Sequence, residues 1–147
     1  MKLTRLALAT SLLPGLAFAA DDIYRLSDQV ITSARQAQPR AEATSANSVF
    51  TRADIERLQV RSVPALLARV PGVQMGSSGG VVSYSVRGTS TAQTLVLVDG
   101  QRIASASSGI ARLDYLSVDS IERVEVTRGP RSALYGADAI GGVIQIF

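Results

Sequence analysis

The sequence predicts an α+β domain in which short helices and long loops accompany a mixed β-sheet. Up to about residue 71 the apolar residues recur at helical spacing, and beyond it they alternate with the period of two that is typical of a strand. Turn-forming pairs, Asp99-Gly100 and Gly129-Pro130, separate the apolar segments of this second part. The change of period and the turn signals together indicate helices followed by strands in one small domain.

Two short helices are expected in the first part of this domain. Thr51 with Asp54 three residues later resembles a capping box and predicts a helix over residues 52–58. Ser62 begins the second helix, which carries a proline in its first turn and ends at Pro71-Gly72. Both helices place leucine, isoleucine or valine on one side, so each has a side to bury.

The strands are expected in the second part. Residues 82–86 alternate apolar and polar side chains, whereas residues 95–98 form a continuous apolar run that suits a central strand. Asp99-Gly100 predicts a hairpin turn after that run. One helical turn is expected over residues 117–122 and a short helix over residues 132–135. The remaining strands are expected at residues 102–103, 124–127 and 143–147.

The N-terminal residues are typical of an export signal. A basic start with Lys2 and Arg5, the apolar stretch Leu6 to Leu16 and the small-x-small pattern Ala17-Phe18-Ala19 predict a signal peptide over residues 1–19. The alternative, a membrane anchor, requires a longer apolar run. The polar residues 20–48 are interpreted as a mobile segment and residues 49–147 as the folded domain. The apolar end, residues 143–147, fits either a strand that continues into a larger protein or a terminal strand paired in the sheet.

The composition argues against an enzyme, a metal site and a nucleic-acid-binding protein. The chain has no cysteine and no histidine, so the commonest general base and transition-metal ligand are both missing. Its single lysine, Lys2, lies in the export signal, which excludes a serine-lysine pair, and no glycine run matches a phosphate or dinucleotide loop. Removal of Lys2 and Arg5 reduces the formal net charge from +3 to about +1, and the arginines do not alternate with aromatic residues. No cofactor is expected.

Five segments in this order resemble the plug domain of TonB-dependent outer-membrane receptors. Within that family the pattern is most similar to receptors for vitamin B12 (cobalamin), while receptors for ferric siderophores share most of the motifs. The similarity covers residues 28–146. The five segments are Leu66–Val73 (LLARVPGV), Tyr84–Gly88 (YSVRG), Leu95–Ile103 (LVLVDGQRI), Ile121–Gly136 (IERVEVTRGPRSALYG) and Ala139–Ile144 (AIGGVI).

The resemblance implies a plug with a mixed four-stranded sheet, lodged in the lumen of a 22-stranded β-barrel of the outer membrane. The TonB C-terminal domain pulls a segment of such a plug, called the TonB box, and the bound cobalamin or ferric siderophore then passes. A barrel is expected to follow Phe147. The alternative is a free-standing periplasmic plug-like protein that binds a ligand or TonB without transporting anything.

The resemblance places the TonB box at residues 28–34, where an apolar pair stands in a polar segment. An extended segment of this kind can add as a strand to the sheet edge of a partner. An ordinary first strand of the domain explains the same pattern. The predicted TonB-binding residues are Asp28, Gln29, Val30, Ile31, Thr32, Ser33 and Ala34.

Two small-residue loops and three charged residues complete the predicted sites. The loops are expected to face the ligand, although plain flexible connections have the same composition. The three charged residues are expected to face the barrel. Without a barrel, both arginines are expected to be exposed or paired with Glu125. Solvated strand-face charges are the alternative. The loop residues are Gly76, Ser77, Ser78, Gly79 and Gly80, with Ala104, Ser105, Ala106, Ser107, Ser108 and Gly109; the charged residues are Arg87, Glu125 and Arg128.

Overall fold

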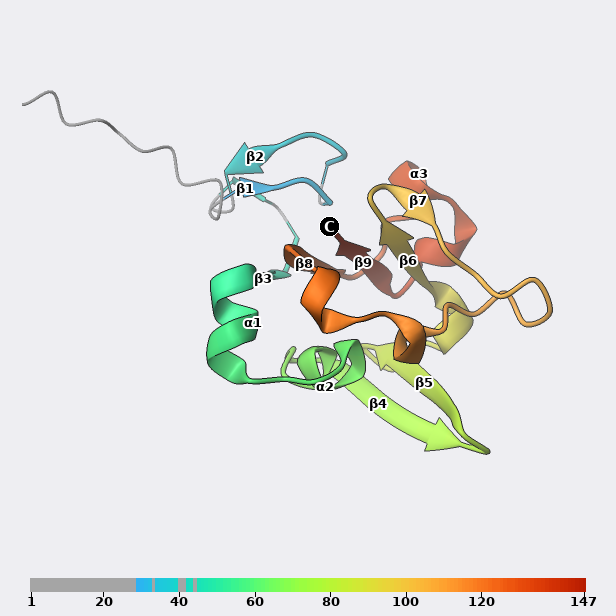
Figure 1. Ribbon diagram of the computed structural model, residues 1–147. Coiled ribbons are helices and arrows are strands. Elements are labelled where there is room, and N and C mark those ends of the chain that lie inside the picture. Colours follow the sequence, from blue (N-terminus) through green and yellow to red (C-terminus); the bar gives the residue numbers. More distant parts are fainter. Residues whose placement is uncertain (1–28, 33, 40–41, 44) are drawn as a thin grey trace, which may run out of the picture.

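The computed structural model describes residues 29–32, 34–39, 42–43 and 45–147 (Figure 1). The predicted signal peptide over residues 1–19 lies outside the described residues, as do Asp28 and Ser33 of the predicted TonB box. No helix in the described part of the chain is long and apolar enough to cross a membrane.

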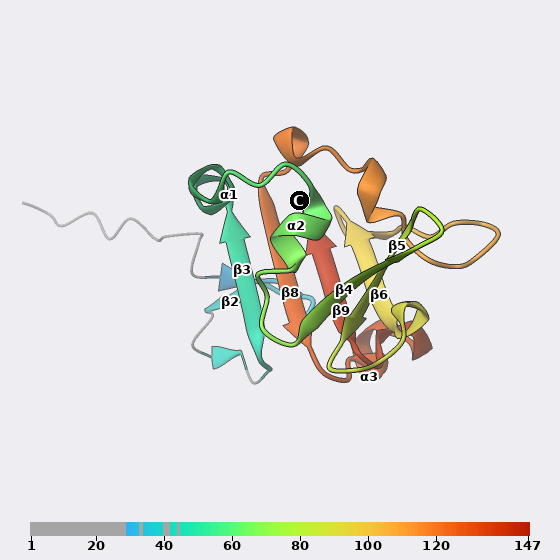
Figure 2. The same cartoon turned by 90° about the horizontal axis from the view of Figure 1, so that it is seen from below.

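A five-stranded mixed sheet forms the centre of the domain (Figure 2). Only β6 and β9 run parallel, and every other neighbouring pair in this sheet is antiparallel. The final strand therefore lies in the middle of the sheet and is paired on both sides. In spatial order the strands are β3 (Asn47–Thr51), β8 (Arg123–Arg128), β9 (Gly142–Ile146), β6 (Thr94–Val98) and β7 (Gln101–Arg102).

The sheet has one strand more than the four that were expected. The additional strand is β3, which pairs along its whole length with β8. Its first residues, Asn47 and Ser48, had been assigned to the mobile segment because they are polar. The side chains of β3 are all half-buried, as suits an edge strand, and such a strand carries a weak apolar signal.

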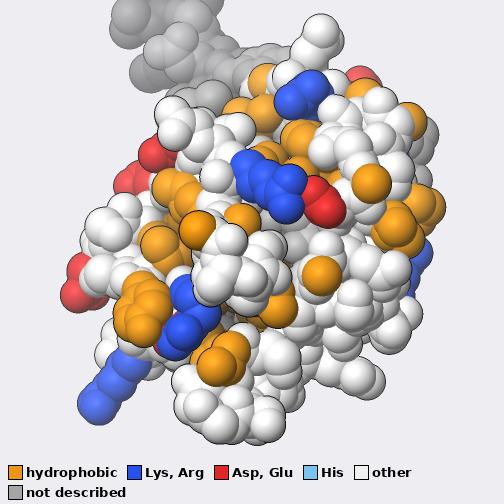
Figure 3. All heavy atoms as spheres, turned by 90° about the vertical axis from the view of Figure 1, so that its right-hand side faces the viewer, with side chains coloured by type: hydrophobic (Ala, Val, Ile, Leu, Met, Phe, Trp, Pro, Cys, Tyr) orange, Lys and Arg blue, Asp and Glu red, His pale blue; other side chains and the backbone are white. Residues whose placement is uncertain are grey.

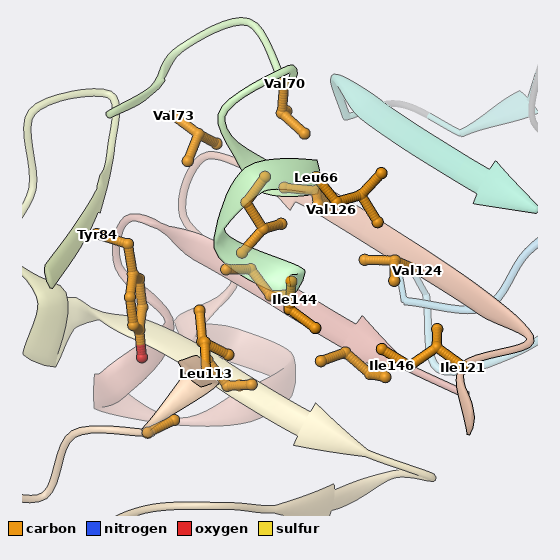
Figure 4. Close-up of a cluster of buried hydrophobic side chains, with 14 of the residues drawn as sticks. Leu66, Val70, Val73, Tyr84, Leu113, Ile121, Val124, Val126, Ile144 and Ile146 are labelled. Atoms are coloured by element: carbon orange, nitrogen blue, oxygen red, sulfur yellow. The ribbon is translucent and has the colours of Figure 1, made fainter. Parts of the chain in front are cut away.

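The main hydrophobic core lies between one face of the sheet and a layer formed by α2 and a hairpin. Alternation along the strands directs Val124 and Val126 of β8 and Ile144 of β9 to this face, where Leu66 of α2 and Tyr84 of the hairpin pack on them (Figure 4). The elements of the covering layer are α2 (Val63–Leu67), β4 (Val73–Ser78) and β5 (Val81–Val86).

The predicted beginnings of both helices are confirmed. Thr51 and Asp54 form a capping box before α1 (Arg52–Leu58), in which the main-chain N–H of Thr51 donates to the Asp54 carboxylate at 3.1 Å. Ser62 caps α2 and accepts a hydrogen bond from the main-chain N–H of Ala65 at 3.3 Å. Local side-chain chemistry therefore fixes where each helix begins.

The segment Gly76–Gly80 is a tight hairpin and not a five-residue loop. β4 continues through Ser78, so only Gly79 and Gly80 form the turn to β5, with φ of 56° and 76°. Two successive residues with positive φ match the right-handed twist of the strands, which favours glycine at both positions. The small side chains at 76–78 hid a strand that pairs in full register with β5.

The opposite face of the sheet is divided into an apolar and a polar half. The apolar half lies under α3 (Ser132–Tyr135), where Tyr135 and Ala139 pack on Leu95, Leu97 and Val143. A small hairpin of β1 (Gln29–Val30) and β2 (Gln38–Pro39) lies on the same side of the domain (Figure 1). The polar half of the face lies on β8 and β9.

Candidate functional site

The β1–β2 hairpin places part of the predicted TonB box against the sheet. Gln29 pairs with Pro39 and Val30 with Gln38. The side chain of Val30 and all of Thr32 are fully buried. These residues were expected in a mobile segment, but burial of Val30 and polar contacts of Thr32 hold them on the domain.

The buried carboxylate of Glu125 is the centre of the site. Its Oε2 accepts three hydrogen bonds, from the main-chain N–H of Ile31 at 3.0 Å, the main-chain N–H of Thr32 at 2.9 Å and Oγ1 of Thr32 at 2.7 Å. Glu125 is 0% exposed. A buried carboxylate needs charge-assisted hydrogen bonds of this kind, and here most of them come from the predicted TonB box.

A ring of polar side chains surrounds this carboxylate. Arg123, two residues earlier on the same face of β8, brings Nη2 to 3.0 Å from Oε1 of Glu125. Gln145 lies directly opposite Glu125 in the sheet, and Oγ1 of Thr32 donates to its Oε1 at 3.5 Å. The cation of Arg123 also lies over the ring of Phe147, 4.6 Å from its centre. The hairpin thus covers a charged and polar surface.

Two further contacts hold the segment. The guanidinium of Arg35 lies 4.9 Å from the ring centre of Tyr135 on α3. Burial raises the pKa of Tyr135, while the positive charge of Arg35 acts in the opposite direction. On the other side, Ile31 lines an open hollow of about 500 Å³ together with Arg52, Ala53 and Phe147. The contacts of Ile31 and Arg35 therefore extend from the start of α1 to α3.

The structure separates the three predicted charges. Arg123, Glu125 and Thr127 share one face of β8, whereas Arg128 lies on the other. Neither arginine pairs with Glu125, because the sheet lies between them; the other expected outcome, exposure, holds for Arg87, whereas Arg128 is half-buried. Glu125 is buried within the chain and does not face outward.

The two arginines meet at the loop that follows α2. Nη1 of Arg128 donates to the carbonyl of Pro71 at 2.7 Å, and the main-chain N–H of Arg87 donates to the carbonyl of Gly72 at 2.8 Å. A Cβ added to Gly129 would lie 3.1 Å from Nη1 of Arg87, so this guanidinium packs over the glycine that follows Arg128. Arg87 itself is exposed.

The predicted ligand loops lie on one side of the domain. The Gly79-Gly80 turn and the loop 104–109 both project to the right in Figure 1. Figure 3 views that side and shows uncharged side chains and backbone interrupted by several Lys or Arg and Asp or Glu groups. Serine hydroxyls predominate in the loop, where Ser105 and Ser107 lie 3.0 Å apart and the N–H of Gly109 donates to the carbonyl of Ser105.

The contacts of Glu125 with Ile31 and Thr32 were missed by sequence reasoning. The period of two in β8 tells which residues share a face but not what covers that face. The position of Glu125 between two valines of a strand was the available signal, because a charged residue needs a partner when its strand is internal. Within the described ranges, no three acidic residues lie close enough together to hold a metal ion.

Comparisons with known proteins agree with this architecture. The family model described as TonB-dependent Receptor Plug Domain matches residues 39–143. A vitamin B12 transporter of Vibrio vulnificus strain YJ016 is 42% identical over 147 aligned residues, which cover 98% of this chain and 24% of that protein. The chain thus spans about a quarter of the length of this relative.

Solved structures share the fold. The siderophore receptor PirA from Acinetobacter baumannii is 33% identical with a TM-score of 0.58, over 68% of this chain and 16% of that one. A chain of the FpvAI–pyocin S2 complex gives a TM-score of 0.65 at 21% identity, over 80% of this chain and 15% of that one, and it is similar in fold alone.

Proposed function

This chain belongs to the TonB-dependent receptor plug domain family, and from that premise we propose that it is the gate of an outer-membrane transporter. In this proposal the domain occludes the lumen of a 22-stranded barrel and binds the TonB C-terminal domain through residues 28–34. The chain reaches the periplasm by an export signal over residues 1–19.

The observation that carries the proposal is the extended backbone at Gln29–Val30, which is followed by the main-chain amides of Ile31 and Thr32 bound to Glu125. Strand addition to a partner depends on main-chain hydrogen bonds and on side chains that alternate between two faces. Val30 and Ile31 supply apolar side chains of that kind. The segment lies on the face of the sheet over β8 and β9, outside the five-stranded sheet itself, so a second protein can bind it once it leaves that face.

Cobalamin is the ligand that we propose first. The vitamin B12 transporter matches almost the whole chain at 42% identity, whereas the siderophore receptor PirA matches 68% of it at 33%. A ferric siderophore is the alternative ligand, and equilibrium binding of cyanocobalamin against a ferric catecholate siderophore separates them.

Titration with the TonB C-terminal domain from the same organism tests the proposed coupling. Residues 20–147 are titrated by calorimetry, next to an Ile31→Pro variant, in which proline removes a main-chain donor and disfavours strand addition. Ala43→Pro is the matched control, because it introduces proline between β2 and β3, outside the segment. Binding by the wild type and the control, with loss in Ile31→Pro, supports the proposal. No binding by a folded wild-type chain contradicts it.

A further inference from the structure

We propose that Glu125 is a catch for the TonB box: it holds residues 31–32 on the sheet, and the segment must leave Glu125 before TonB can pair with it. The TonB half of this inference rests on the proposed function. The other half, that one buried carboxylate keeps the segment docked, concerns this chain alone and is testable without a partner.

The main-chain amides make the two states exclusive. Strand addition uses the N–H groups of the added segment as donors to the partner's carbonyls. The amides of Ile31 and Thr32 already donate to one oxygen, Oε2 of Glu125, at 3.0 and 2.9 Å. In an extended strand successive N–H groups point to opposite edges, so a partner takes one of these two amides, and the bent backbone that brings both to one oxygen has to straighten first. Each amide carries one hydrogen, so pairing with the partner displaces the carboxylate.

The chemistry of the covered surface favours release. Burying a carboxylate is costly, and the hydrogen bonds from the hairpin together with Arg123 offset that cost while the segment is docked. When the segment leaves, water solvates Glu125 and Gln145 again. An apolar surface of the same size would have no such compensation on exposure. The docked and released states are therefore closer in free energy than an apolar contact would allow.

Other contacts, outside Glu125, also hold the segment on the domain. Val30 is buried, Ile31 lines the hollow beside Phe147, and Arg35 lies over Tyr135. These contacts add apolar and cation–π stabilisation, but they leave the amides free to exchange. Only Glu125 receives both amides and the Thr32 hydroxyl. The hydrogen-exchange rates of the amides of residues 31 and 32 therefore report directly whether Glu125 holds the segment.

Hydrogen exchange resolved to single amides tests this assignment in the wild type, Glu125→Ala and Thr32→Val. We expect Glu125→Ala to accelerate exchange at residues 31 and 32 about tenfold or more, since hydrogen bonds to a charged acceptor are among the stronger ones. Thr32→Val removes one of the three hydrogen bonds to Glu125 without replacing a residue of the sheet, and it should give a smaller acceleration of exchange. Glu122→Gln is the control, because Glu122 is an exposed acid that lines the same hollow as Ile31. It should leave the exchange rates of both amides unchanged.

Exchange in β9 monitors the fold of each variant. Acceleration at residues 31 and 32 with β9 unchanged supports the catch. Unchanged exchange at the two amides in Thr32→Val and in a folded Glu125→Ala overturns it. If Glu125→Ala loses protection in β9 as well, Thr32→Val, which lies outside the sheet, decides alone.

Binding of the TonB C-terminal domain separates the inference from the function on which it rests. If both hold, the variants bind TonB more tightly, in proportion to their faster exchange. Faster exchange without any TonB binding upholds the catch and contradicts the proposed function. TonB binding of equal strength in all variants, with unchanged exchange, upholds the proposed function and overturns the catch.

Discussion

The guanidinium of Arg128 donates to the carbonyl of Pro71 across 57 residues of sequence, at 2.7 Å from Nη1. Its Nη2 also lies 3.4 Å from the carbonyl of Asn47 on β3. One side chain on β8 thereby fastens the edge strand and the loop after α2. The hydrogen bond to Pro71, together with the one from the main-chain N–H of Arg87 to Gly72, brings both proposed barrel-facing arginines to the loop after α2.

Arg128→Ala is expected to lower the free energy of unfolding by about 1–2 kcal/mol, because two carbonyls lose a charged donor. Chemical denaturation measures the change. Arg69→Ala is the matched control, since Arg69 is exposed and its removal should change stability by less than about 0.5 kcal/mol. Equal effects of the two substitutions would contradict a structural role for Arg128.

Tyr84 predicts a loss of stability in alkali. Burial raises its pKa to about 12, and a backbone hydrogen bond with Ala111 acts in the opposite direction. The unfolded chain ionises this phenol near pH 10 and the folded chain only near pH 12, so the stabilisation is complete below pH 10 and declines as the pH rises through that window. We expect a loss of about 2 kcal/mol between pH 10 and pH 12.

Tyr84→Phe should remove that part of the pH dependence. The chain has no lysine after Lys2, so few other groups titrate in this range. The slope that remains in Tyr84→Phe reports the other tyrosines, including Tyr135, whose pKa burial also raises. Identical slopes for the variant and the wild type would show that the Tyr84 hydroxyl is not shielded from water.

The capping box of α1 predicts a loss of stability in acid. Hydrogen bonds from the side chain and backbone of Thr51 lower the pKa of Asp54 below the ordinary aspartate value of 3.8, and Arg57 adds to the effect. The stabilisation is therefore present above pH 3.8, where the unfolded chain has lost this proton, and it disappears as the pH falls through the lower pKa of the folded chain. Thr51→Ala should cost about 1 kcal/mol at neutral pH and flatten the acid dependence. Ser62→Ala, at the cap of α2, is the comparison that should lower stability without changing that dependence.

Features determined by neighbouring residues could be predicted from the sequence. The Thr51–Asp54 box and the Asp99-Gly100 turn need only a few adjacent residues, and both occur where they were expected. The hairpin 73–86 was half predicted, because alternation marked β5 whereas glycine and serine concealed β4.

Features that depend on distant partners could not be predicted. Thr32 and Glu125 are 93 residues apart, and nothing near either residue indicates the other. Alternation correctly gives the face on which Glu125 lies, but that face is polar, so the hydrophobic pattern does not reveal its cover. The position of β3 was misjudged for the same reason, since edge strands need little apolar character.

Gly142 is expected to tolerate no side chain. A Cβ at this position would overlap the main-chain oxygen of Thr127 in the neighbouring strand, and a paired backbone cannot retreat. Gly142→Ala should therefore destabilise the fold by about 3 kcal/mol, the upper range for overpacking. Gly76→Ala is the matched control in β4, where the Cβ would meet only the movable hydroxyl of Ser83. Similar melting temperatures for the two variants would contradict the close approach at Gly142.

Three buried threonines predict opposite effects of the same substitution. Oγ1 of Thr32 donates to Glu125 at 2.7 Å, whereas Oγ1 of Thr94 and Oγ1 of Thr127 have no hydrogen-bond partner among the residues that the structure describes. A hydroxyl without a partner loses its hydration on folding and gains nothing in return, so its replacement by a methyl group removes a cost. Thr94→Val and Thr127→Val should each raise the free energy of unfolding by about 1 kcal/mol, while Thr32→Val should lower it by a similar amount, because it leaves Glu125 with one donor fewer. Urea denaturation of the three variants under one set of conditions checks the signs. If Thr127→Val lowers stability as Thr32→Val does, then the hydroxyl of Thr127 has a partner, and the sheet face around Glu125 holds a larger polar network than the hairpin contacts alone.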